Sequence, residues 1–359
     1  MERAIALAER GRGIVSPNPL VGAVAVREGR VVGEGWHEGP GTAHAEVVAL
    51  RAAGDRSRGA TLYTTLEPCN RSGRTPPCTT AMIGAGVTRV VIGALDPNLG
   101  AGEPGVHELR MAGIEVEPGI WSAEAERQNA AFLKHVRTGL PLVTMKMAAS
   151  LDGKVAARDG SSRWITGAEA RADVHRLRAA SDAIVVGAGT ALADDPSLTV
   201  REPGYRGAPV LRVLVDARGR VPAAGDLFDD AAPTLVAATD LAPAERVEEW
   251  RAAGAEVLEY GFDGRGVPLD SLLADLGKRD VQGVLLEGGP TLAWTAVRDG
   301  LVDRVVVYLA PILVGGTGAP GILGGDGFGP IGAAERVRIT SFCRIGDDLR
   351  VEADVHRDR

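Results

Sequence analysis

The stretch GATLYTTLEPC (residues 59–69) joins a β-strand pattern to a possible metal ligand. Its β-branched and aromatic residues favour a strand, and Cys69 follows at the carboxyl end of that strand. Two more ligand types lie close by, with His44 before the stretch and Cys78 after it. One imidazole and two thiolates make a three-ligand zinc site whose fourth tetrahedral position stays open for water.

Glu46 lies two residues after His44, where a carboxylate can move protons to and from that water without binding the metal. Together with the later Pro-Cys pairs, this is the H-x-E…P-C pattern of deaminases that act on amino-purines and amino-pyrimidines. Here eight residues separate Cys69 from Cys78, where two are usual. We therefore predict a catalytic zinc ion bound by His44, Cys69 and Cys78, with Glu46 as the catalytic carboxylate.

A structural zinc site is the main alternative, in which the metal only joins loops. Such a site usually has four protein ligands, and His37 is the nearest candidate for the fourth. Free cysteines are most often buried apolar residues, but Cys69 and Cys78 follow proline in polar, turn-rich loops. Cys343 stands alone in a β-like segment, so we expect it to pack in the core.

Two polar residues near the ligands could support the site. Glu67 directly precedes the Pro-Cys pair of the strand end and could orient a metal ligand. Asn18 lies in the turn SPNPLVG (residues 16–22). Its amide could hydrogen-bond a substrate base or ribose hydroxyl, or it could only cap the turn.

Composition and charge are those of an ordinary soluble globular protein. The 359 residues are enough for two domains, with 45% hydrophobic and 24% charged residues. The net charge of −7 argues against nucleic acid as a partner, although local arginines could still bind a small anion. We expect no membrane segment, because no apolar run approaches the roughly 18 residues that span a bilayer. The charged N-terminus and the three cysteines argue against a secretory signal and a disulfide framework, so we expect a cytoplasmic protein.

The chain divides near residue 140 into two αβ series. Residues 122–138 predict one connecting helix with Ser122 as N-cap, broken by Gly139-Leu140-Pro141. Cys78 and His44 would each begin a helix, whose positive end favours a thiolate. The first series predicts a hairpin over 21–32, a helix over 44–53, strands over 60–64 and 89–92, and a short helix over 79–83 that ends at Gly84. Such alternation favours a layered sheet with helices on its faces.

The second series contains two glycine turns, each at the end of a strand pattern. EGGPT (residues 287–291) follows a strand over 284–286, and GAGT (187–190) follows a strand over 183–186. Such turns bring backbone N–H groups close to a phosphate, although neither is a Rossmann GxGxxG fingerprint. Because ligands gather at the carboxyl ends of strands, we expect a cofactor cleft there. The series also predicts strands over 142–147, 210–215 and 305–309, helices over 168–180 and after Pro290, and a surface loop over 221–232.

Four segments of the first half resemble one enzyme family. NPLVG (18–22), VVGEGWHEGPGTAHAE (31–46), GATLYTTLEPC (59–69) and GRTPPC (73–78) are similar to the deaminase domain of the bifunctional diaminohydroxyphosphoribosylaminopyrimidine deaminase/reductases of riboflavin biosynthesis. The eight-residue cysteine loop that ends in GRTPPC separates this family from cytidine deaminases. The family usually has a histidine two residues after the first cysteine, where this chain has Arg71. The stretch Asp96-Pro97-Asn98 also matches, while Glu103 stands where the family tends to have a basic residue or glycine.

The second half resembles the reductase domain of the same family. The matching segments are KMAASLDGK (146–154), SSRWITG (161–167), HRLRAASDAIVVGAGT (175–190), DDPSLTVR (194–201) and EGGPTL (287–292). The resemblance implies an α/β protein with a cytidine-deaminase-like three-layer domain over 1–121 and a dihydrofolate-reductase-like domain over 141–359. Residues 122–140 would be the connecting helix or linker.

The resemblance also implies the residues of the reductase site. The NADPH site would be lined by Ala148, Trp164, Thr190, Asp194, Gly289, Pro290, Thr291, Leu292, Ala293, Trp294 and Thr295. The substrate would contact Ser162, Arg178, Leu198, Arg201 and Glu287. Lys146 and Glu287 could assist proton movement. Arg178 and Arg201 suit a sugar phosphate, because guanidinium binds phosphate bidentately, although a surface salt bridge is the alternative for either.

The implied function is two consecutive steps of riboflavin biosynthesis. Zinc-dependent hydrolysis would deaminate 2,5-diamino-6-(5-phosphoribosylamino)pyrimidin-4(3H)-one, and NADPH would then reduce the ribosyl group, giving 5-amino-6-(5-phosphoribitylamino)uracil. One zinc ion per deaminase domain, NADPH and this small phosphoribosyl-pyrimidine would be the ligands, in a homodimer or tetramer joined through reductase domains. Two alternatives remain open: a reductase whose zinc domain is a catalytically weak scaffold, and a non-enzymatic binding protein.

Overall fold

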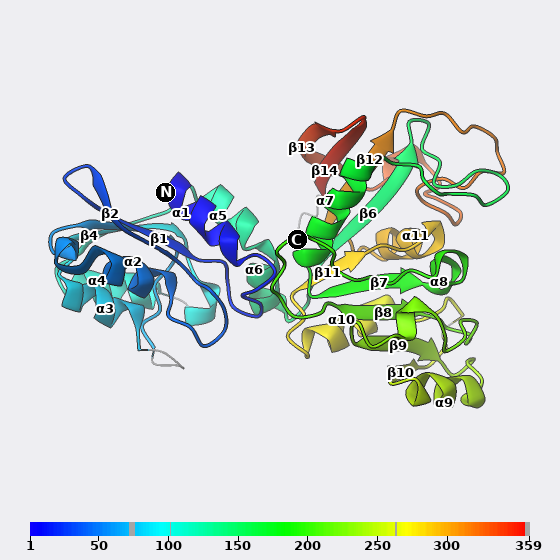
Figure 1. Cartoon of the computed structure of the whole chain (residues 1–359), viewed down its shortest axis with the longest axis horizontal. Coiled ribbons are helices and arrows are strands. Elements are labelled where there is room, and N and C mark those ends of the chain that lie inside the picture. The colour runs from blue at the N-terminus through cyan, green and yellow to red at the C-terminus, as the bar shows by residue number, and fades with distance from the viewer. Residues whose placement is uncertain (72–75, 101, 263, 356–359) are drawn as a thin grey trace. The chain divides into compact units, whose positions relative to one another are not determined.

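The computed structural model describes residues 1–71, 76–100, 102–262 and 264–355. The chain separates into two compact units, Met1–Gly139 and Leu140–Arg359, each with its own sheet (Figure 1). This division lies at the predicted break near residue 140, while the finer domain limits stay predictions. Every helix in the described parts of the chain is too short or too polar to reach across a bilayer.

The first unit is built on a five-stranded sheet in the order β2-β1-β3-β4-β5. Its strands are β1 (Gly22–Arg27), β2 (Arg30–Trp36), β3 (Thr61–Leu66), β4 (Arg89–Ala94) and β5 (Glu115–Pro118). β1 runs antiparallel to β2 and β3, whereas β3, β4 and β5 are parallel. The hairpin and both strands predicted for this part of the chain are confirmed.

Helices cover both faces of this sheet, so the unit has three layers (Figure 1). The first face carries α2 (Ala45–Ala53), α3 (Cys78–Ala85) and α4 (Pro104–Met111); the second carries α1 (Glu2–Ala8) and α5 (Ser122–Gln128), which is followed by α6 (Ala130–Thr138). Short 3₁₀ turns lie at Glu9–Gly11, Gly54–Ser57 and Pro97–Leu99. Leu62 and Ile92 pack toward α2 and α3, whereas Leu66 packs toward α5 and α6.

A glycine in β2 lets α2 approach the sheet closely. A Cβ atom at Gly35 would lie 2.4 Å from the carbonyl oxygen of Ala45, far inside van der Waals contact. Any larger residue at this position would therefore move the first turn of α2 away from β2. His44 and Glu46 lie at that first turn, so the close packing sets where both side chains lie.

Three helix predictions for the first unit are wrong. α3 continues through Gly84 and ends at Gly86, whose φ of 70° is the left-handed value that glycine favours. The segment over 122–138 is two helices interrupted at Asn129. The side chain of Asn129 accepts a hydrogen bond from the Leu20 N–H at 2.8 Å and donates one to the Leu20 carbonyl oxygen at 2.9 Å. Side-chain bonds of this kind to the backbone compete with the regular hydrogen bonds of a helix. Ser122 is the first helical residue, because the residue before it has a left-handed backbone and takes the N-cap position.

The second unit is built on a nine-stranded sheet in the order β10-β9-β8-β7-β11-β6-β12-β14-β13. Its strands are β6 (Leu142–Ser150), β7 (Ala183–Gly187), β8 (Leu211–Val215), β9 (Thr234–Thr239), β10 (Glu256–Tyr260), β11 (Gly283–Leu286), β12 (Arg304–Ala310), β13 (Val337–Ile345) and β14 (Asp348–Val355). Neighbouring strands from β10 to β12 are parallel, and β14 and β13 extend the sheet antiparallel. The strands predicted for this half are confirmed.

Helices cover both faces of this sheet as well. One face carries α7 (Ala168–Ala179), α8 (Ala188–Asp194) and α9 (Ala244–Ala252); the other carries α10 (Leu269–Gly277) and α11 (Pro290–Arg298). Short 3₁₀ turns lie at Asp226–Phe228 and Ile331–Ala333. In β6, Met145 and Met147 pack toward α10 and α11, so the alternate residues Lys146 and Ala148 lie on the α7 side.

One expectation for the second unit is wrong and another is confirmed. Cys343 is exposed and does not pack in the core. It lies on β13, which is the last strand of the sheet and lies beside β14, and the neighbouring Phe342 is 76% exposed. The predicted surface loop over 221–232 is confirmed, since most of its residues are exposed; it is anchored to the core beside α9 by Val221 and Leu227, which are 4% and 2% exposed.

Candidate active sites

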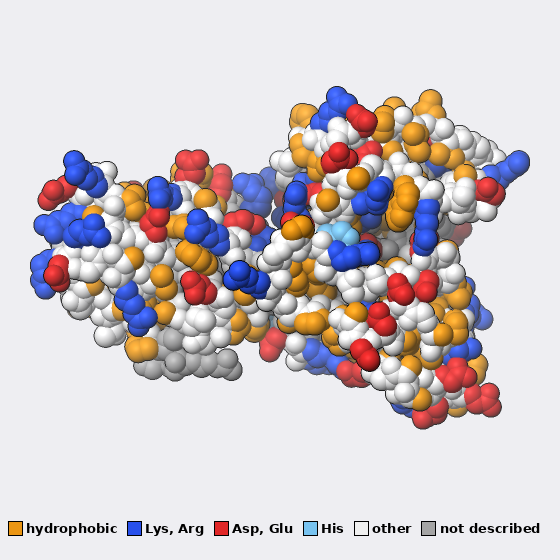
Figure 2. Space-filling model, viewed as in Figure 1, with side chains coloured by type: hydrophobic (Ala, Val, Ile, Leu, Met, Phe, Trp, Pro, Cys, Tyr) orange, Lys and Arg blue, Asp and Glu red, His pale blue; other side chains and the backbone are white. Residues whose placement is uncertain are grey.

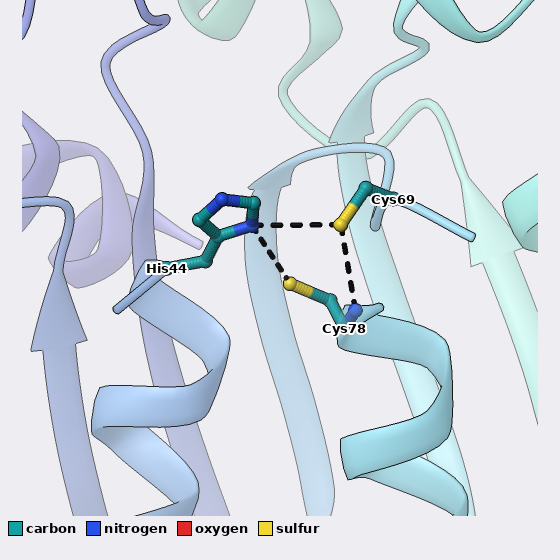
Figure 3. Close-up of side chains that lie close together, drawn as sticks. All are labelled: His44, Cys69 and Cys78. Carbon is teal, nitrogen blue, oxygen red and sulfur yellow. Dashed lines mark hydrogen bonds between the residues drawn. The ribbon is translucent and has the colours of Figure 1, made fainter. Parts of the chain in front are cut away.

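The three predicted metal ligands lie together in the first unit (Figure 3). The Nδ1 atom of His44 lies 3.1 Å from the Sγ atom of Cys78 and 3.5 Å from that of Cys69. All three ligand atoms lie within 4.8 Å of one another. Tetrahedral ligands at about 2.0–2.3 Å from zinc are about 3.5 Å apart, so these side chains fit a zinc ion. Imidazole and thiolate donors also suit zinc better than magnesium or calcium.

Each ligand is placed by the start or end of a regular element. His44 is the N-cap of α2, Cys78 is the first residue of α3, and Cys69 lies beyond β3. The backbone N–H of Cys78 donates to the Sγ atom of Cys69 at 3.4 Å. The hydrogen bond from the Cys78 thiol lowers the pKa of Cys69. The prediction that His44 and Cys78 each begin a helix is therefore confirmed, and the two helix starts meet at one site.

Glu46 lies in the first turn of α2, with its carboxylate beside the ligands. One carboxylate oxygen accepts a hydrogen bond from Thr64 Oγ1 at 3.2 Å, and the other lies 3.5 Å from the Sγ atom of Cys78. The residue is 3% exposed, and this burial raises the pKa of its carboxyl group. Glu46 is not one of the three clustered ligands, so its carboxyl group is free to take up and release a proton.

His37 does not complete a four-ligand site. Its Nε2 atom lies 2.9 Å from the Nδ2 atom of Asn18, and its Nδ1 atom lies 3.4 Å from the carbonyl oxygen of Ala43. Both ring nitrogens are therefore engaged, and the ligand cluster found in the described residues consists of the three residues above. The structural-zinc alternative thus lacks its nearest fourth ligand. Asn18 is oriented by His37, and its contact with substrate stays a prediction.

Glu67 supports neighbouring loops and does not contact a metal ligand through its hydrogen bonds. Its carboxylate accepts from the backbone N–H groups of Gly105 at 3.0 Å and of Val106 and Asp96 at 3.3 Å each. Two of these donors belong to the first turn of α4, whose N–H groups have no partner within the helix. We therefore assign Glu67 to the start of α4 and not to orienting a ligand.

Arg71, where the resembling family usually has histidine, connects the cysteine loop to the loop after β4. Its Nη2 atom donates to the carbonyl oxygen of Leu99 at 2.8 Å, and its side chain is exposed. Leu99 directly follows the matching stretch Asp96-Pro97-Asn98. Residues 72–75, which include the start of GRTPPC, lie outside the described residues.

The two predicted glycine segments of the second unit lie next to each other. Residues 287–289 form a turn after β11, whereas residues 188–190 are not a separate turn but begin helix α8 directly after β7. β7 and β11 are neighbouring parallel strands, so the segments after them share the carboxyl edge of the sheet. A Cβ atom at Gly289 would lie 3.2 Å from the Oγ1 atom of Thr190, which shows how closely the segments approach. Gly289 is also the N-cap of the nine-residue helix α11, whose first N–H groups suit a phosphate.

The predicted cofactor residues fall into an accessible group and a buried group. Trp164 is 69% exposed, and the guanidinium carbon of Arg171 lies 4.6 Å from its ring centre. Ala148 on β6 and Asp194 at the end of α8 are partly exposed. Three of the predicted residues on α11 are 9% exposed or less: Leu292, Ala293 and Trp294. Because these three side chains are buried, a ligand at the carboxyl edge of the sheet would contact the accessible residues Trp164, Ala148 and Asp194 instead.

Arg178 and Glu287 form a buried ion pair. The Nε and Nη2 atoms of Arg178 donate to the two carboxylate oxygens of Glu287 at 2.7 and 3.0 Å, and Nη1 donates to the Thr199 carbonyl at 3.1 Å. Burial of Glu287 acts to raise its pKa, but the charge of Arg178 and the hydrogen bonds that Arg178 donates outweigh burial and lower it. Burial lowers the pKa of Lys146. The fold thus brings together three predicted residues from β6, α7 and the turn after β11.

His175 is a residue of this region that the sequence analysis missed. Its Nδ1 atom accepts a hydrogen bond from the backbone N–H of Arg201 at 3.2 Å. The available signal was its position three residues before Arg178, which places both side chains on one face of α7. Arg201 and Ser162 are exposed or partly exposed to solvent, whereas Leu198 is buried, with an exposed fraction of 2%. Figure 2 shows Lys, Arg and His side chains around a hollow in this unit, a surface that suits an anionic ligand.

The chain is similar to known proteins over nearly its whole length. It is 42% identical over 369 aligned positions to the riboflavin biosynthesis protein RibD of Bacillus amyloliquefaciens, covering 100% of this chain and 99% of the relative. It is 41% identical over 360 positions to the riboflavin biosynthesis protein RibD of Escherichia coli, covering 97% of this chain and 96% of that one. The chain belongs to the RibD family.

Family models and solved structures divide this RibD-family chain in the same way. The cytidine and deoxycytidylate deaminase zinc-binding region matches residues 1–94, and the RibD C-terminal domain matches residues 141–351. Acinetobacter baumannii RibD, form 1, aligns with a TM-score of 0.88 at 39% identity, covering 99% of this chain and 98% of that one. A Thermotoga maritima protein, described as a diaminohydroxyphosphoribosylaminopyrimidine deaminase/5-amino-6-(5-phosphoribosylamino)uracil reductase, aligns with a TM-score of 0.85 at 33% identity, covering 99% and 97%. The predicted α/β fold, a deaminase-like domain followed by a RibD reductase domain, is confirmed.

Proposed function

We propose that this chain catalyses two consecutive steps of riboflavin biosynthesis. As a RibD-family protein with a deaminase domain and a reductase domain, it is a bifunctional enzyme. Its first substrate would be 2,5-diamino-6-(5-phosphoribosylamino)pyrimidin-4(3H)-one, and its final product would be 5-amino-6-(5-phosphoribitylamino)uracil. The observation that carries the proposal is the cluster of His44, Cys69 and Cys78 with the Glu46 carboxyl group beside it.

The deamination depends on Glu46 as a proton carrier. When zinc is bound by the three ligands, it supplies a Lewis acid that makes water nucleophilic near neutral pH. Glu46 would take the proton that the attacking water loses and deliver it to the departing amino nitrogen, so that ammonia leaves and a carbonyl forms at C2. The hydrogen bond from Thr64 fixes the Glu46 carboxylate for this transfer. Asn18, oriented by His37, would hydrogen-bond the base or the ribose.

Changing Glu46 to alanine tests this step. Loss of a positioned proton carrier should slow ammonia release by about 10²- to 10⁴-fold, while NADPH oxidation with the pre-deaminated substrate continues. Glu38→Ala is the matched control, because Glu38 is exposed in the same part of the chain. Zinc content, measured in both variants, should stay at one ion per chain in each. Ammonia release that survives in Glu46→Ala would show that the assignment of Glu46 is wrong.

The reductase-only alternative is not favoured. It requires the first unit to be an inert scaffold, yet that unit keeps three zinc-type ligands and an adjacent buried carboxyl group. The match to a deaminase zinc-binding region covers the same residues. The experiment above also separates the two possibilities, because a scaffold would release no ammonia in the unchanged protein.

NADPH would bind where the two glycine segments meet. The N-terminus of α11 after Gly289 suits the pyrophosphate, and the exposed Trp164 suits a ring of the cofactor. Bound NADPH would supply the hydride that reduces C1′ of the sugar. The chain's own part would be to orient the substrate, and Lys146 and Glu287 would assist proton movement as the ribose ring opens.

A crowded turn tests this cofactor site. Gly289→Val would place side-chain atoms against Thr190 and should weaken NADPH binding about 10-fold or more, measured by fluorescence titration. Gly261→Val is the matched control, because Gly261 is exposed after β10 and nothing lies within 4 Å of a Cβ atom there. Ammonia release should be normal in both variants. Equal NADPH affinity in the two variants would contradict this placement.

The proposed enzyme is a cytoplasmic homo-oligomer joined through β13. This edge strand has unpaired backbone groups along one side, and its apolar residues Ile339 and Phe342 are 62% and 76% exposed. A second copy of the same strand would cover both. Phe342→Asp should therefore lower the molar mass measured by light scattering, and an unchanged mass would contradict this interface. The free thiols of Cys69, Cys78 and Cys343 fit a reducing compartment.

A further inference from the structure

Helix α7 contacts the segment after α8 through two side chains. His175 and Arg178 lie three residues apart on α7, so they project from one face of the helix. Arg178 donates to the carbonyl oxygen of Thr199 at 3.1 Å, and His175 accepts from the N–H of Arg201 at 3.2 Å. Both contacts are made to backbone atoms, so they fix the path of the chain at Thr199 and Arg201 and do not depend on those side chains.

The same segment is anchored at its other side by Leu198. Its side chain is 2% exposed and packs in the core around β7 and β8, with a left-handed φ of 46°. Arg201 therefore lies three residues beyond a buried anchor, on a segment without regular secondary structure. Among the described residues, the bond from its N–H to His175 is the hydrogen bond that fixes the backbone of Arg201 to α7. The direction of its exposed side chain depends on this bond.

Arg201 is the better candidate of the two predicted phosphate ligands. Three donor atoms of Arg178 are already used by Glu287 and by the Thr199 carbonyl. Arg201 has no ion-pair partner among the described residues, and its side chain is exposed. A phosphate dianion would gain two charge-assisted hydrogen bonds from such a guanidinium.

The surroundings of His175 favour the neutral ring that this bond requires. Burial lowers the pKa of His175, and the charges of Arg178 and Arg201 lower it further. The charge of Glu287 and the hydrogen bond to the Thr199 carbonyl raise this pKa, but by less. A neutral ring can accept at Nδ1 while Nε2 carries the hydrogen. A protonated ring could not accept the Arg201 N–H, and it would add a third positive charge beside two guanidinium groups.

We propose that His175 is a positioning residue of the reductase, which fixes the backbone of Arg201 so that the guanidinium binds the phosphate group of the substrate. This inference rests on the proposed function, because it requires a phosphorylated reductase substrate. His175 itself would not touch the reacting C1′ atom. Its loss should therefore weaken substrate binding and leave the rate of hydride transfer nearly unchanged.

The test compares three variants of the full-length chain. His175→Leu removes the acceptor, whereas His175→Asn keeps one, because the asparagine Oδ1 is the same number of bonds from Cα as the histidine Nδ1. Arg176→Gln is the matched control on the same helix. Arg176 makes an exposed ion pair with Glu202 at 3.4 Å beside the same segment, and exposed pairs contribute little.

The readout is NADPH oxidation with 5-amino-6-(5-phosphoribosylamino)uracil and with its dephosphorylated form. His175→Leu should raise KM for the phosphorylated substrate about 10-fold, the factor that corresponds to 1.4 kcal/mol, with kcat within about threefold of the unchanged protein. His175→Asn and Arg176→Gln should keep KM within about threefold. The effect of His175→Leu should disappear with the dephosphorylated substrate, because no phosphate is there to bind.

Three results would overturn the proposal: an unchanged KM in His175→Leu, an equal rise in His175→Leu and His175→Asn, or an equal rise with both substrates. If His175→Leu does not fold, His175→Gln replaces it, because its acceptor is displaced by one bond and the same KM rise is expected. Absence of NADPH oxidation in the unchanged protein would overturn the proposed reductase function, and this proposal with it. If the unchanged protein oxidises NADPH normally and any of the three results above is found, the role of His175 is overturned and the proposed reductase function is not.

Discussion

Replacing Glu287 by glutamine should destabilise the second unit by about 3–5 kcal/mol, the usual effect of removing one partner from a buried ion pair. The side chains of Arg178 and Glu287 are 12% and 8% exposed, and two hydrogen bonds of 2.7 and 3.0 Å join them. Unit charges 4 Å apart attract by about 4 kcal/mol at an effective dielectric constant of about 20. Glutamine keeps the shape of the carboxyl group and loses its charge, so the Arg178 guanidinium would stay buried without a counter-ion. Lys146 adds less, because burial lowers its pKa and it can release its proton.

Calorimetry of the full-length chain can follow the two units as separate transitions. A loss of 3–5 kcal/mol should lower the melting temperature of the second unit by about 6–20 °C and leave the first unit unchanged. Glu248→Gln is the matched control, because Glu248 pairs with Arg251 at 2.6 Å while the two side chains are 70% and 45% exposed. Exposed pairs of this kind contribute at most about 1 kcal/mol, so this control should shift the transition by only about 2–4 °C.

A Glu287→Gln variant as stable as Glu248→Gln would refute the reasoning. The double variant Arg178→Met with Glu287→Leu gives a second check, because apolar replacement of a buried ion pair is often neutral or stabilising. Removal of both charges should therefore recover most of the lost stability. A double variant no more stable than Glu287→Gln would mean that lost packing, and not the unpaired charge, causes the effect.

Gly35→Ala should disturb the zinc centre indirectly, because its Cβ atom would lie 2.4 Å from the carbonyl oxygen of Ala45; zinc content and ammonia release should both fall. Gly84→Ala, on α3 with open space around it, should leave both unchanged, and equal zinc content in the two variants would contradict this account. Removal of zinc by a chelator should lower the melting temperature of the first unit and stop ammonia release, while NADPH oxidation with the deaminated substrate continues. Asp152→Asn should destabilise the second unit at pH 5, because hydrogen bonds, first that from Ser150, lower the pKa of Asp152 to about 2. This stabilisation is present above the ordinary pKa of 3.8 and is lost as pH falls toward about 2. The difference in melting temperature between Asp152→Asn and the unchanged protein should therefore narrow over this range, and a constant difference would contradict this account.

The zinc centre could be predicted from the sequence because its residues are marked by short-range signals. His44 and Cys78 begin helices, and Cys69 follows a strand, so local propensity already places each ligand at the end of an element. The role of Glu67 could not be read in this way. Its backbone partners at α4 lie 38 and 39 residues later in the chain, and only the folded packing brings them to its carboxylate.

The second unit shows the limit of pattern reading more clearly. Five of its nine strands were predicted, whereas β9, β10, β13 and β14 were not. Helix α9 was missed because it buries only Val247 and Trp250 among charged residues, which gives a weak periodic signal. The exposure of Cys343 depends on which strand ends the sheet, and pairing between distant strands decides that. His175 was missed for a related reason, because the N–H that it accepts belongs to a residue 26 positions later.

The central position of β6 has a consequence for how the chain is made. β6 is the first strand of its sheet to leave the ribosome, but Leu142 pairs with Gly283 and Thr144 pairs with Arg304. At ~5–20 residues per second, roughly 7–30 s of translation separate Leu142 from Gly283. The sheet of the first unit, by contrast, is paired entirely within its own strands and can be complete before β11 is synthesised. During this interval the nascent chain carries a finished deaminase domain followed by an unpaired apolar strand, which is the segment that chaperones would need to protect.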